Sequence, residues 1–425
     1  MAVVQGDNGP NNLPGTAGAD QIDGLGGDDT MTGLGGNDTV SGDNGIDTAV
    51  LSGTRASYQF TFEANGSTWN SDPFITTHTT LKSFDGVASR DGNDTFNDIE
   101  YIQFADGTVR WHDVPVSYQA VGGEQEYVGV FGGTMNDTMV GHAGSNGFIG
   151  GLGNDYIDGG AGFDTAEYYP YNSYVTMLPV AGGVQVNLAL GTATGAWGND
   201  TLVGIEGAAG SLYSDVLIGN DQANYFDALP GNDTLTGGLG DDTIDGGSGL
   251  DWAIYQGNLH DYEIGNDLGG ERQVNDLALG SGFDFALNIE RLQFDDLGIA
   301  FDLDGHAGAA ARLVGVLFGS DYVHDPAYMR IFIEAFDDGY DPELIASVAI
   351  DIVYPTYTDE QIAQLIWFNL AHQQGAPSDI ALLTGLIEQY SDAWLAVQAG
   401  NTIYNENSID FAALVTNGVE FLPII

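Results

Sequence analysis

A nine-residue repeat is the sequence feature that most restricts how this chain folds. Residues 15–50 divide into GTAGADQID, GLGGDDTMT, GLGGNDTVS and GDNGIDTAV. Glycine fills the first and fourth columns, aspartate the sixth, and an apolar residue the eighth. We therefore predict that each unit is a glycine-rich turn that directs a carboxylate inward, followed by a short strand with one buried side chain.

The same period returns twice more, at residues 132–167 and 210–254, so the chain holds thirteen nonapeptides in three blocks. One unit cannot close a core by itself. Two units must form one turn of a solenoid, and the turns must stack to bury a continuous core. Stacking places sixth-column residues that are 18 positions apart directly above one another.

These repeats resemble the RTX family, the bacterial proteins with calcium-binding nonapeptide repeats. The resemblance covers most of residues 15–304 and implies a mainly β fold, in which pairs of repeats form the turns of a right-handed parallel β-roll. It also implies one calcium ion between successive turns.

Calcium suits the residues that the repeats bring together. Stacked carboxylates repel each other in a partly desolvated turn, and a hard cation that takes about 6–8 oxygen ligands removes this repulsion. Asn146 and Asn224 keep an oxygen but lose the charge, so we expect weaker sites there. Pairing residues 18 apart predicts about seven ions. The predicted ligands are Asp20, Asp29, Asp38, Asp47, Asp137, Asn146, Asp155, Asp164, Asp215, Asn224, Asp233, Asp242 and Asp251.

Composition narrows the classes of partner. The formal net charge is −53, with 46 Asp and 15 Glu against one Lys and seven Arg. Such a charge argues against nucleic acid or an anionic membrane as a partner. The chain has no cysteine, so bound calcium would replace disulfides as the cross-link of an extracellular protein. No stretch reaches the 18 or more apolar residues expected of a membrane span.

Export is predicted from the family rather than from the termini. The N-terminal residues lack the basic and apolar regions of a Sec-type signal peptide. RTX proteins typically leave the cell by type I secretion with an uncleaved C-terminal signal, and residues 418–425 are compatible with one. We therefore expect a secreted protein, either extracellular or at the cell surface.

The chain is predicted to contain four segments. Residues 1–14 read as an irregular lead-in, 15–113 as a first roll with capping strands, and 114–304 as a second, longer roll with capping strands. Within the second roll, we expect 168–209 to form irregular turns or an outward hairpin. Residues 305–425 show helical periodicity, with caps expected at Asp325, Asp341, Thr358 and Ser391, and should form an all-α bundle.

No catalytic motif accompanies the repeats. The chain has no His-Glu-x-x-His helix, no Gly-x-Ser-x-Gly elbow and no Gly-rich phosphate loop with its lysine. The Ile-Glu pairs at Glu100 and Glu290 belong to a duplicated segment, and we read them as parts of capping strands rather than as catalytic groups.

These observations predict a non-enzymatic, calcium-binding structural protein of the bacterial surface, such as a surface-layer (S-layer), filament or matrix component that self-assembles. The alternative is a calcium-dependent adhesin that binds a cell-surface glycan. A polysaccharide-modifying enzyme and an RTX-type toxin rank behind both.

Overall fold

The computed structural model describes residues 1–54, 58–64, 79–85, 91, 94–110, 117–119, 128–169, 180–266, 272–277, 282–401 and 419–421. The chain forms two compact units, Met1–Gly249 and Leu250–Ile425. The domain boundaries predicted after residues 113 and 304 stay predictions. No helix in the described residues is long and apolar enough to cross a membrane.

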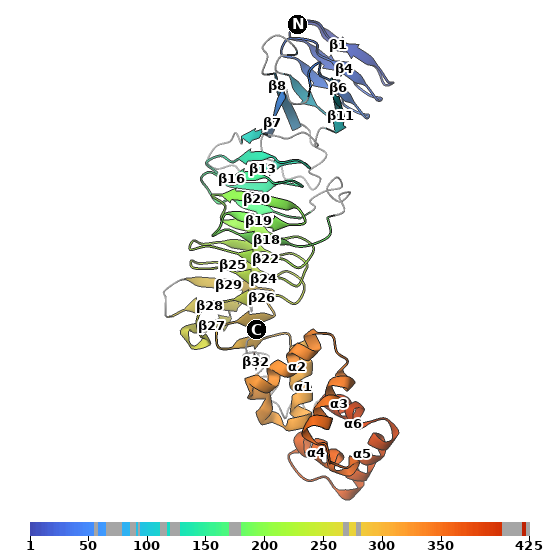
Figure 1. Ribbon diagram of the computed structural model, residues 1–425, viewed down its shortest axis with the longest axis vertical. Helices are drawn as coiled ribbons and strands as arrows, with labels where there is room; N and C mark the ends of the chain where they lie inside the picture. Colours follow the sequence, from blue (N-terminus) through green and yellow to red (C-terminus); the bar gives the residue numbers. More distant parts are fainter. Residues whose placement is uncertain are drawn as a thin grey trace. The chain divides into compact units, whose positions relative to one another are not determined.

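The first repeat block builds a parallel β-roll of short strands (Figure 1). One sheet contains β1 (Val3–Gln5), β3 (Gln21–Asp23), β5 (Thr39–Ser41) and β9 (Thr95–Asn97). The other contains β2 (Asn12–Pro14), β4 (Thr30–Thr32), β6 (Thr48–Val50) and β10 (Tyr101–Phe104). Thr30 of β4 pairs with Thr48 of β6, so two nonapeptides make one turn, as predicted. The eighth-column side chains are at most 1% exposed and form the core: Ile22, Met31, Val40 and Ala49.

Residues 1–14 do not form the irregular lead-in that we expected. β1 pairs in parallel with β3, and β2 with β4, so these residues make the first turn of the roll. The physical reason is present in the sequence. Val4 and Leu13 precede Ile22 at intervals of nine, and Gly6 and Gly9 occupy the first and fourth columns.

Antiparallel strands interrupt and close this first roll. β7 (Tyr58–Ala64) and β8 (Thr79–Asp85) form a hairpin between β6 and β9 in the chain, and β8 pairs with β9. β11 (Gly107–Arg110) pairs antiparallel with β10. The segment that we read as a capping strand from its duplicated sequence therefore supplies both the last parallel strand of this sheet and its antiparallel neighbour.

The second and third repeat blocks share one longer roll. One sheet contains β12 (Ser117–Gln119), β14 (Thr138–Val140), β16 (Tyr156–Asp158), β20 (Gly198–Val203), β22 (Val216–Ile218) and β24 (Thr234–Thr236). The other contains β13 (Val128–Phe131), β15 (Asn146–Ile149), β17 (Thr165–Glu167), β21 (Gly207–Ala209), β23 (Tyr225–Asp227) and β25 (Thr243–Asp245).

The prediction for residues 168–209 was wrong in its details. β18 (Val184–Asn187) and β19 (Thr192–Gly195) form a hairpin inside the first of these sheets, between β20 and β22. In the opposite sheet, β21 pairs directly with β23. β20 and β21 are strands of the parallel roll itself, since they pair in parallel with β16 and β17.

The second unit begins with strands. β26 (Trp252–Ile254) pairs in parallel with β30 (Arg291–Gln293), which pairs antiparallel with β31 (Gly298–Ala300). After the 3₁₀ turn η4 (Leu259–Asp261), β27 (Tyr262–Asn266), β28 (Arg272–Asp276) and β29 (Phe283–Leu287) form an antiparallel meander. β32 (Val419–Phe421) adds one strand antiparallel to β31, so the last described residues join a sheet.

Helices follow, as predicted, and pack around one apolar core (Figure 1). They are α1 (His306–Phe318), the 3₁₀ turn η5 (Ser320–His324), α2 (Pro326–Asp337), α3 (Pro342–Val353), α4 (Asp359–Ala371), α5 (Pro377–Gln389) and α6 (Asp392–Gly400). The predicted caps are confirmed, since a side-chain oxygen accepts a backbone N–H at Asp325, Asp341, Thr358 and Ser391.

Candidate calcium sites

The turns between strands carry the sixth-column residues inward. In the turn at 24–29, Leu25 and Gly27 both adopt positive φ, of 71° and 99°. This left-handed backbone lets a six-residue connection fold tightly enough to bury Asp29. All thirteen predicted ligands are buried, with at most 3% of each residue exposed.

The buried carboxylates are connected in rows along the roll. The backbone N–H of one sixth-column residue donates to Oδ1 of the residue 18 positions later, in the next turn. The donor–acceptor distance is 2.7 Å from Asp20 to Asp38, and six such pairs span 2.6–2.8 Å. We call each row a carboxylate ladder. The pairs are Asp20–Asp38, Asp29–Asp47, Asp137–Asp155, Asn146–Asp164, Asp215–Asp233 and Asn224–Asp242. The proposed pair Asp233–Asp251 stays a prediction.

In the ladders of the first and second repeat blocks, several aspartates have a second carboxylate oxygen without a protein donor. Among the described residues, Oδ2 is buried and has no hydrogen-bond partner in Asp29, Asp38, Asp47, Asp155 and Asp164. A buried carboxylate oxygen that has lost water and gained no donor costs stability unless a cation compensates it. These oxygens are therefore the strongest sign of a cation site in the described chain.

Electrostatics at these positions favours a neutral carboxyl in the absence of a cation. Burial, opposed in part by the N–H donated by the preceding turn, raises the pKa of Asp155 to about 8 and that of Asp164 to about 7. Burial likewise raises the pKa of Asp47 to about 6. Asp20 is the opposite case, because the backbone N–H of Ala2 and the side chain of Thr16 lower its pKa. A divalent ion would bind the ionised forms that burial disfavours.

Backbone carbonyl oxygens lie near the Oδ2 atoms of the ladder aspartates. A Cβ placed on Gly24 would lie 2.5 Å from Oδ2 of Asp29 and 2.9 Å from the carbonyl oxygen of Gly42. A Cβ on Gly15 would lie 2.7 Å from the carbonyl oxygen of Gly33 and 3.1 Å from Oδ2 of Asp20. The first-column glycine thus leaves room where a carboxylate and a carbonyl of adjacent turns meet.

This donor set fits calcium. Ca²⁺ prefers carboxylate and carbonyl oxygens and accepts a flexible number of them. The described residues contain no group of three or more His, Cys, Asp or Glu side chains placed to hold a metal. The stacked pairs would supply two side-chain ligands to each site, one from each turn, with main-chain carbonyls as the other protein ligands. The ligand assignments and the number of ions remain predictions.

Two further aspartates join the ladders, and the sequence analysis missed them. The N–H of Asp38 donates to Oδ1 of Asp94, and that of Asp155 to Oδ1 of Asp200, both at 2.9 Å. Asp94 and Asp200 are buried. The signal was a Gly-Asn-Asp-Thr tetrapeptide at 92–95 and 198–201, identical to the one that begins at Gly36 in the first block.

The two asparagines in the sixth column, Asn146 and Asn224, lie at the same position in their ladders. Asn146 and Asn224 each begin a ladder, and their Oδ1 atoms accept an N–H from their own turn, at 2.9 Å from His142 and 2.8 Å from Asn220. Nδ2 of Asn146 is buried without a partner among the described residues. A neutral amide thus replaces a carboxylate at the first position of a row, which supports the expectation of weaker cation binding there.

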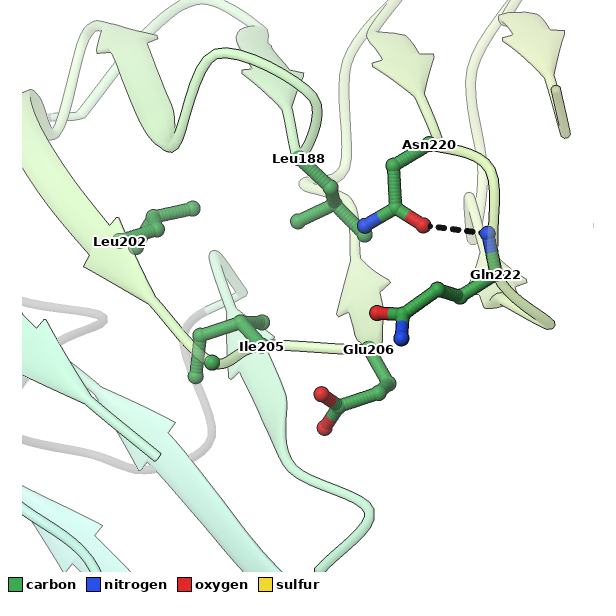
Figure 2. Close-up of a pocket in the computed structure, with 7 residues that line it drawn as sticks. Leu188, Leu202, Ile205, Glu206, Asn220 and Gln222 are labelled. Carbon is green, nitrogen blue, oxygen red and sulfur yellow. Dashed lines mark hydrogen bonds between the residues drawn. The ribbon is translucent and has the colours of Figure 1, made fainter. Parts of the chain in front are cut away.

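A small pocket of about 90 Å³ lies beside the turn at 204–206 (Figure 2). Leu188, Leu202 and Ile205 give it apolar walls, whereas Glu206 and Gln222 bring polar groups. This volume is far below the roughly 300–1,000 Å³ of pockets that bury small organic ligands. The pocket therefore does not suggest a substrate site.

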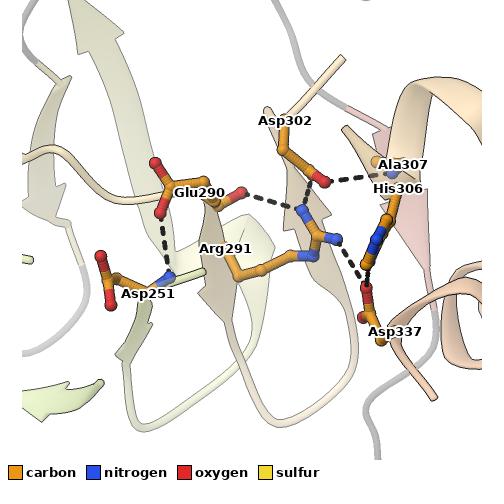
Figure 3. A network of polar contacts seen from close by, with 7 residues as sticks. All are labelled: Asp251, Glu290, Arg291, Asp302, His306, Ala307 and Asp337. Atoms are coloured by element: carbon orange, nitrogen blue, oxygen red, sulfur yellow. Dashed lines mark hydrogen bonds and ion pairs between the residues drawn. The ribbon is translucent and has the colours of Figure 1, made fainter. Parts of the chain in front are cut away.

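A charged cluster links the strands of the second unit to its helices (Figure 3). The guanidinium of Arg291, in β30, is fully buried and pairs with Asp302, just before α1, and with Asp337 at the end of α2. Nδ1 of His306 lies 2.7 Å from the same Asp337 carboxylate. Burial lowers the pKa of Arg291 to about 10, so the side chain stays charged at neutral pH.

Comparison with known proteins agrees with the repeats. The chain matches the RTX calcium-binding nonapeptide repeat in 4 copies, at residues 14–49, 131–166, 209–235 and 218–253. No curated protein matches the chain.

Among solved structures, the chain resembles the crystal structure of the extracellular lipase LipA from Serratia marcescens, with 16% identity and a TM-score of 0.20. The match covers 67% of this chain and 37% of the lipase chain. At this TM-score the likeness carries no argument about activity, and the expectation that the chain is not an enzyme stays a prediction. The matched repeats coincide with the three blocks that build the rolls, so the chain carries RTX calcium-binding nonapeptide repeats.

Proposed function

We propose that this protein is a secreted structural component of the bacterial cell surface, in a surface layer, filament or extracellular matrix. Its rolls fold when calcium binds between their turns, and the folded copies then associate. Calcium is scarce inside bacterial cells and plentiful outside, so the chain would remain unfolded until export.

The observation that carries this proposal is the set of partnerless Oδ2 atoms in the ladders. A roll whose buried aspartates lack donors is poorly stable by itself and gains stability from each bound cation. The net charge of −53 acts in the same direction, because self-repulsion opposes a compact state until cations reduce it. The rolls would thus serve as stiff modules that form only where calcium is present.

Association is supported by a feature of the helical segment. Leu344, Val348 and Ile352 recur every four residues along α3 and are 51%, 48% and 72% exposed. Residues at this spacing lie on one face of a helix, and an apolar stripe of this kind is typical of a surface that another protein covers. We assign this stripe to contacts between copies of the chain.

The test is molar mass by light scattering, with circular dichroism on the same samples, as purified protein passes from chelator into rising calcium. We expect β structure to form first and the mass then to climb into large assemblies. The triple variant L344E/V348E/I352E should fold at the same calcium concentration and stay monomeric. A wild-type protein that folds with calcium yet remains monomeric would rule out assembly, and one that folds fully in chelator would rule out the calcium switch.

A further inference from the structure

Three short turns break the regular pattern of the rolls in the same way. A regular turn holds six residues, as at 24–29 between β3 and β4. Residues 98–100, 204–206 and 288–290 instead join β9 to β10, β20 to β21 and β29 to β30 with three. Each short turn begins with a residue at positive φ, continues with a buried isoleucine and ends with glutamate. The first residues are Asp98, Gly204 and Asn288, with φ of 50°, 58° and 49°.

The glutamate of each short turn occupies the sixth column by register. Tyr101, which follows Glu100, pairs with the seventh-column Thr48, and its N–H donates to the carbonyl of Asp47, as Thr48 does to Asp29. The glutamate carboxylate also takes the place of the next aspartate, because the N–H of Asp47 donates to Oε2 of Glu100 at 2.6 Å.

The same hydrogen bond recurs in the other two short turns. The N–H of Asp164 donates to Oε2 of Glu206 at 2.9 Å, and that of Asp251 to Oε2 of Glu290 at 2.9 Å (Figure 3). A turn with half the usual residues follows a different path, and the additional methylene of glutamate carries the carboxylate to the ladder. Its recurrence at three places in the chain indicates a built feature of the fold.

The oxygens around two of these glutamates match those of a regular site. Oδ2 of Asp47 and of Asp164 is buried and has no hydrogen-bond partner among the described residues. A Cβ on Gly42 would lie 2.6 Å from Oδ2 of Asp47, and one on Gly159 would lie 2.7 Å from Oδ2 of Asp164. Each such Cβ would also collide with the carbonyl oxygen of the first residue of the short turn, Asp98 or Gly204. That carbonyl stands where a regular turn offers its first-column carbonyl.

We propose that each short turn completes a terminal calcium site, in which its glutamate is a ligand together with the last aspartate of the ladder. The pairs are Asp47 with Glu100, Asp164 with Glu206, and Asp251 with Glu290. None of the three glutamates lies within a matched repeat, so these sites add to the seven predicted from the nonapeptides. This inference rests on the proposed calcium-dependent folding.

The glutamate also ends its ladder. Beyond Glu206 the next sixth-column residue is Asn224, whose Nδ2 donates to the carbonyl of Glu206 at 3.0 Å, and Asn224 then begins a new ladder with Asp242. A glutamate that only capped the row would need no charge to accept the N–H. A glutamate that binds calcium does need its charge. Removing the charge while keeping the oxygen therefore distinguishes a cap from a calcium ligand.

The experiment is equilibrium dialysis of the full chain against calcium, which counts bound ions, with circular dichroism to follow folding. The triple variant E100Q/E206Q/E290Q keeps an oxygen that accepts each N–H and loses only the charge. We expect it to fold with calcium and to bind three fewer ions per chain at the concentration that saturates the wild type. The single variant E206Q should bind one fewer, and it provides the same count if the triple variant folds poorly.

The matched control is E167Q/E263Q/E388Q, which removes the same charge from glutamates outside the ladders and should leave the count unchanged. A triple ladder variant that binds as many ions as the wild type would overturn the terminal sites while leaving calcium-dependent folding intact. A wild type that binds no calcium would instead overturn the proposed function itself.

Discussion

At the scale of single residues, the first-column glycines are needed for space as well as for turn geometry. At Gly24, the position of a Cβ is taken up by Oδ2 of Asp29 and the carbonyl oxygen of Gly42. At Gly18, a fourth-column glycine of the first block, no heavy atom lies within 4 Å of that position and φ lies outside the left-handed region. The two glycines look alike in sequence, yet the structure gives them different constraints.

Gly24→Ala should therefore destabilise the first roll, whereas Gly18→Ala should be tolerated. The added methyl group must displace a carboxylate or a carbonyl that would face calcium, so we expect Gly24→Ala to raise the calcium concentration at the folding midpoint several-fold. Gly18→Ala should shift it less than twofold. Calcium titration followed by circular dichroism measures both midpoints, and equal shifts would show that the space at Gly24 has no special role.

The pKa shifts of the buried aspartates predict how pH acts on the calcium-free protein. Burial raises the pKa of Asp155 to about 8 and that of Asp164 to about 7, well above the ordinary aspartate value of 3.8. A group with a raised pKa in the folded state stabilises the fold at low pH relative to high pH. In chelator, the free energy of folding should thus become less favourable as pH rises from about 4 to 8, most steeply at about pH 5 to 6, where both carboxyls are protonated only in the folded state. Residual β structure in chelator should therefore decrease as pH rises.

Saturating calcium should weaken or reverse this trend, because the ion binds the deprotonated carboxylates. Each pKa unit corresponds to about 1.4 kcal/mol, so the change in β structure with pH should be large enough to see by circular dichroism. The variant D155N/D164N provides the control and should show a flatter pH dependence in chelator. An unchanged slope would assign the effect to the overall negative charge instead.

At the scale of elements, the strands could be predicted more fully than the connections. The period of nine located each short strand and its buried residue, because that pattern is set locally. The hairpin β18–β19 could not be placed, since its alternating residues suit either a sheet insertion or an outward excursion. Only pairing with β20 and β22 decides between them.

The short turns were equally hard to recognise. Their Ile-Glu pair was visible as a duplication at Glu100 and Glu290, and we expected a capping strand there. The period of nine is lost when three residues are removed from a turn, so Glu206 remained unnoticed in the middle of the longer roll. The register of Tyr101 with Thr48 reveals that these glutamates continue the sixth column.

Arg291 ties the strand after the third short turn to the helices, and its removal should destabilise the second unit. Arg291→Met would leave Asp302 and Asp337 without their buried partner, a loss of about 3–5 kcal/mol for pairs of this kind. Arg330→Met removes a half-buried pair with Glu334 on α2 and should cost about 0–1 kcal/mol. Denaturant unfolding in saturating calcium, followed at 222 nm, compares the two, and similar losses would contradict a special role for Arg291.

At the scale of the whole molecule, the net charge and the repeats together predict calcium binding from the sequence alone. Thirteen aspartates and asparagines in register predicted buried, stacked ligands, and all thirteen are buried. Two more ladder aspartates lay outside the blocks, because long insertions separate them from their repeats. The role of the helices could not be predicted, since an apolar stripe such as that on α3 is distinguished from core only by its exposure.

The spacing of ladder partners along the chain also predicts the order in which parts of the rolls fold. Partners within a block are 18 residues apart, whereas Asp38 and Asp94 are separated by 56, with the β7–β8 hairpin between them. Closing the longer loop costs about 1 kcal/mol more in chain entropy, from a logarithmic dependence on loop length. Contacts between distant residues also form more slowly. A chain emerging into calcium would therefore fold at two speeds, with each block coiling first and the hairpins being drawn in afterwards.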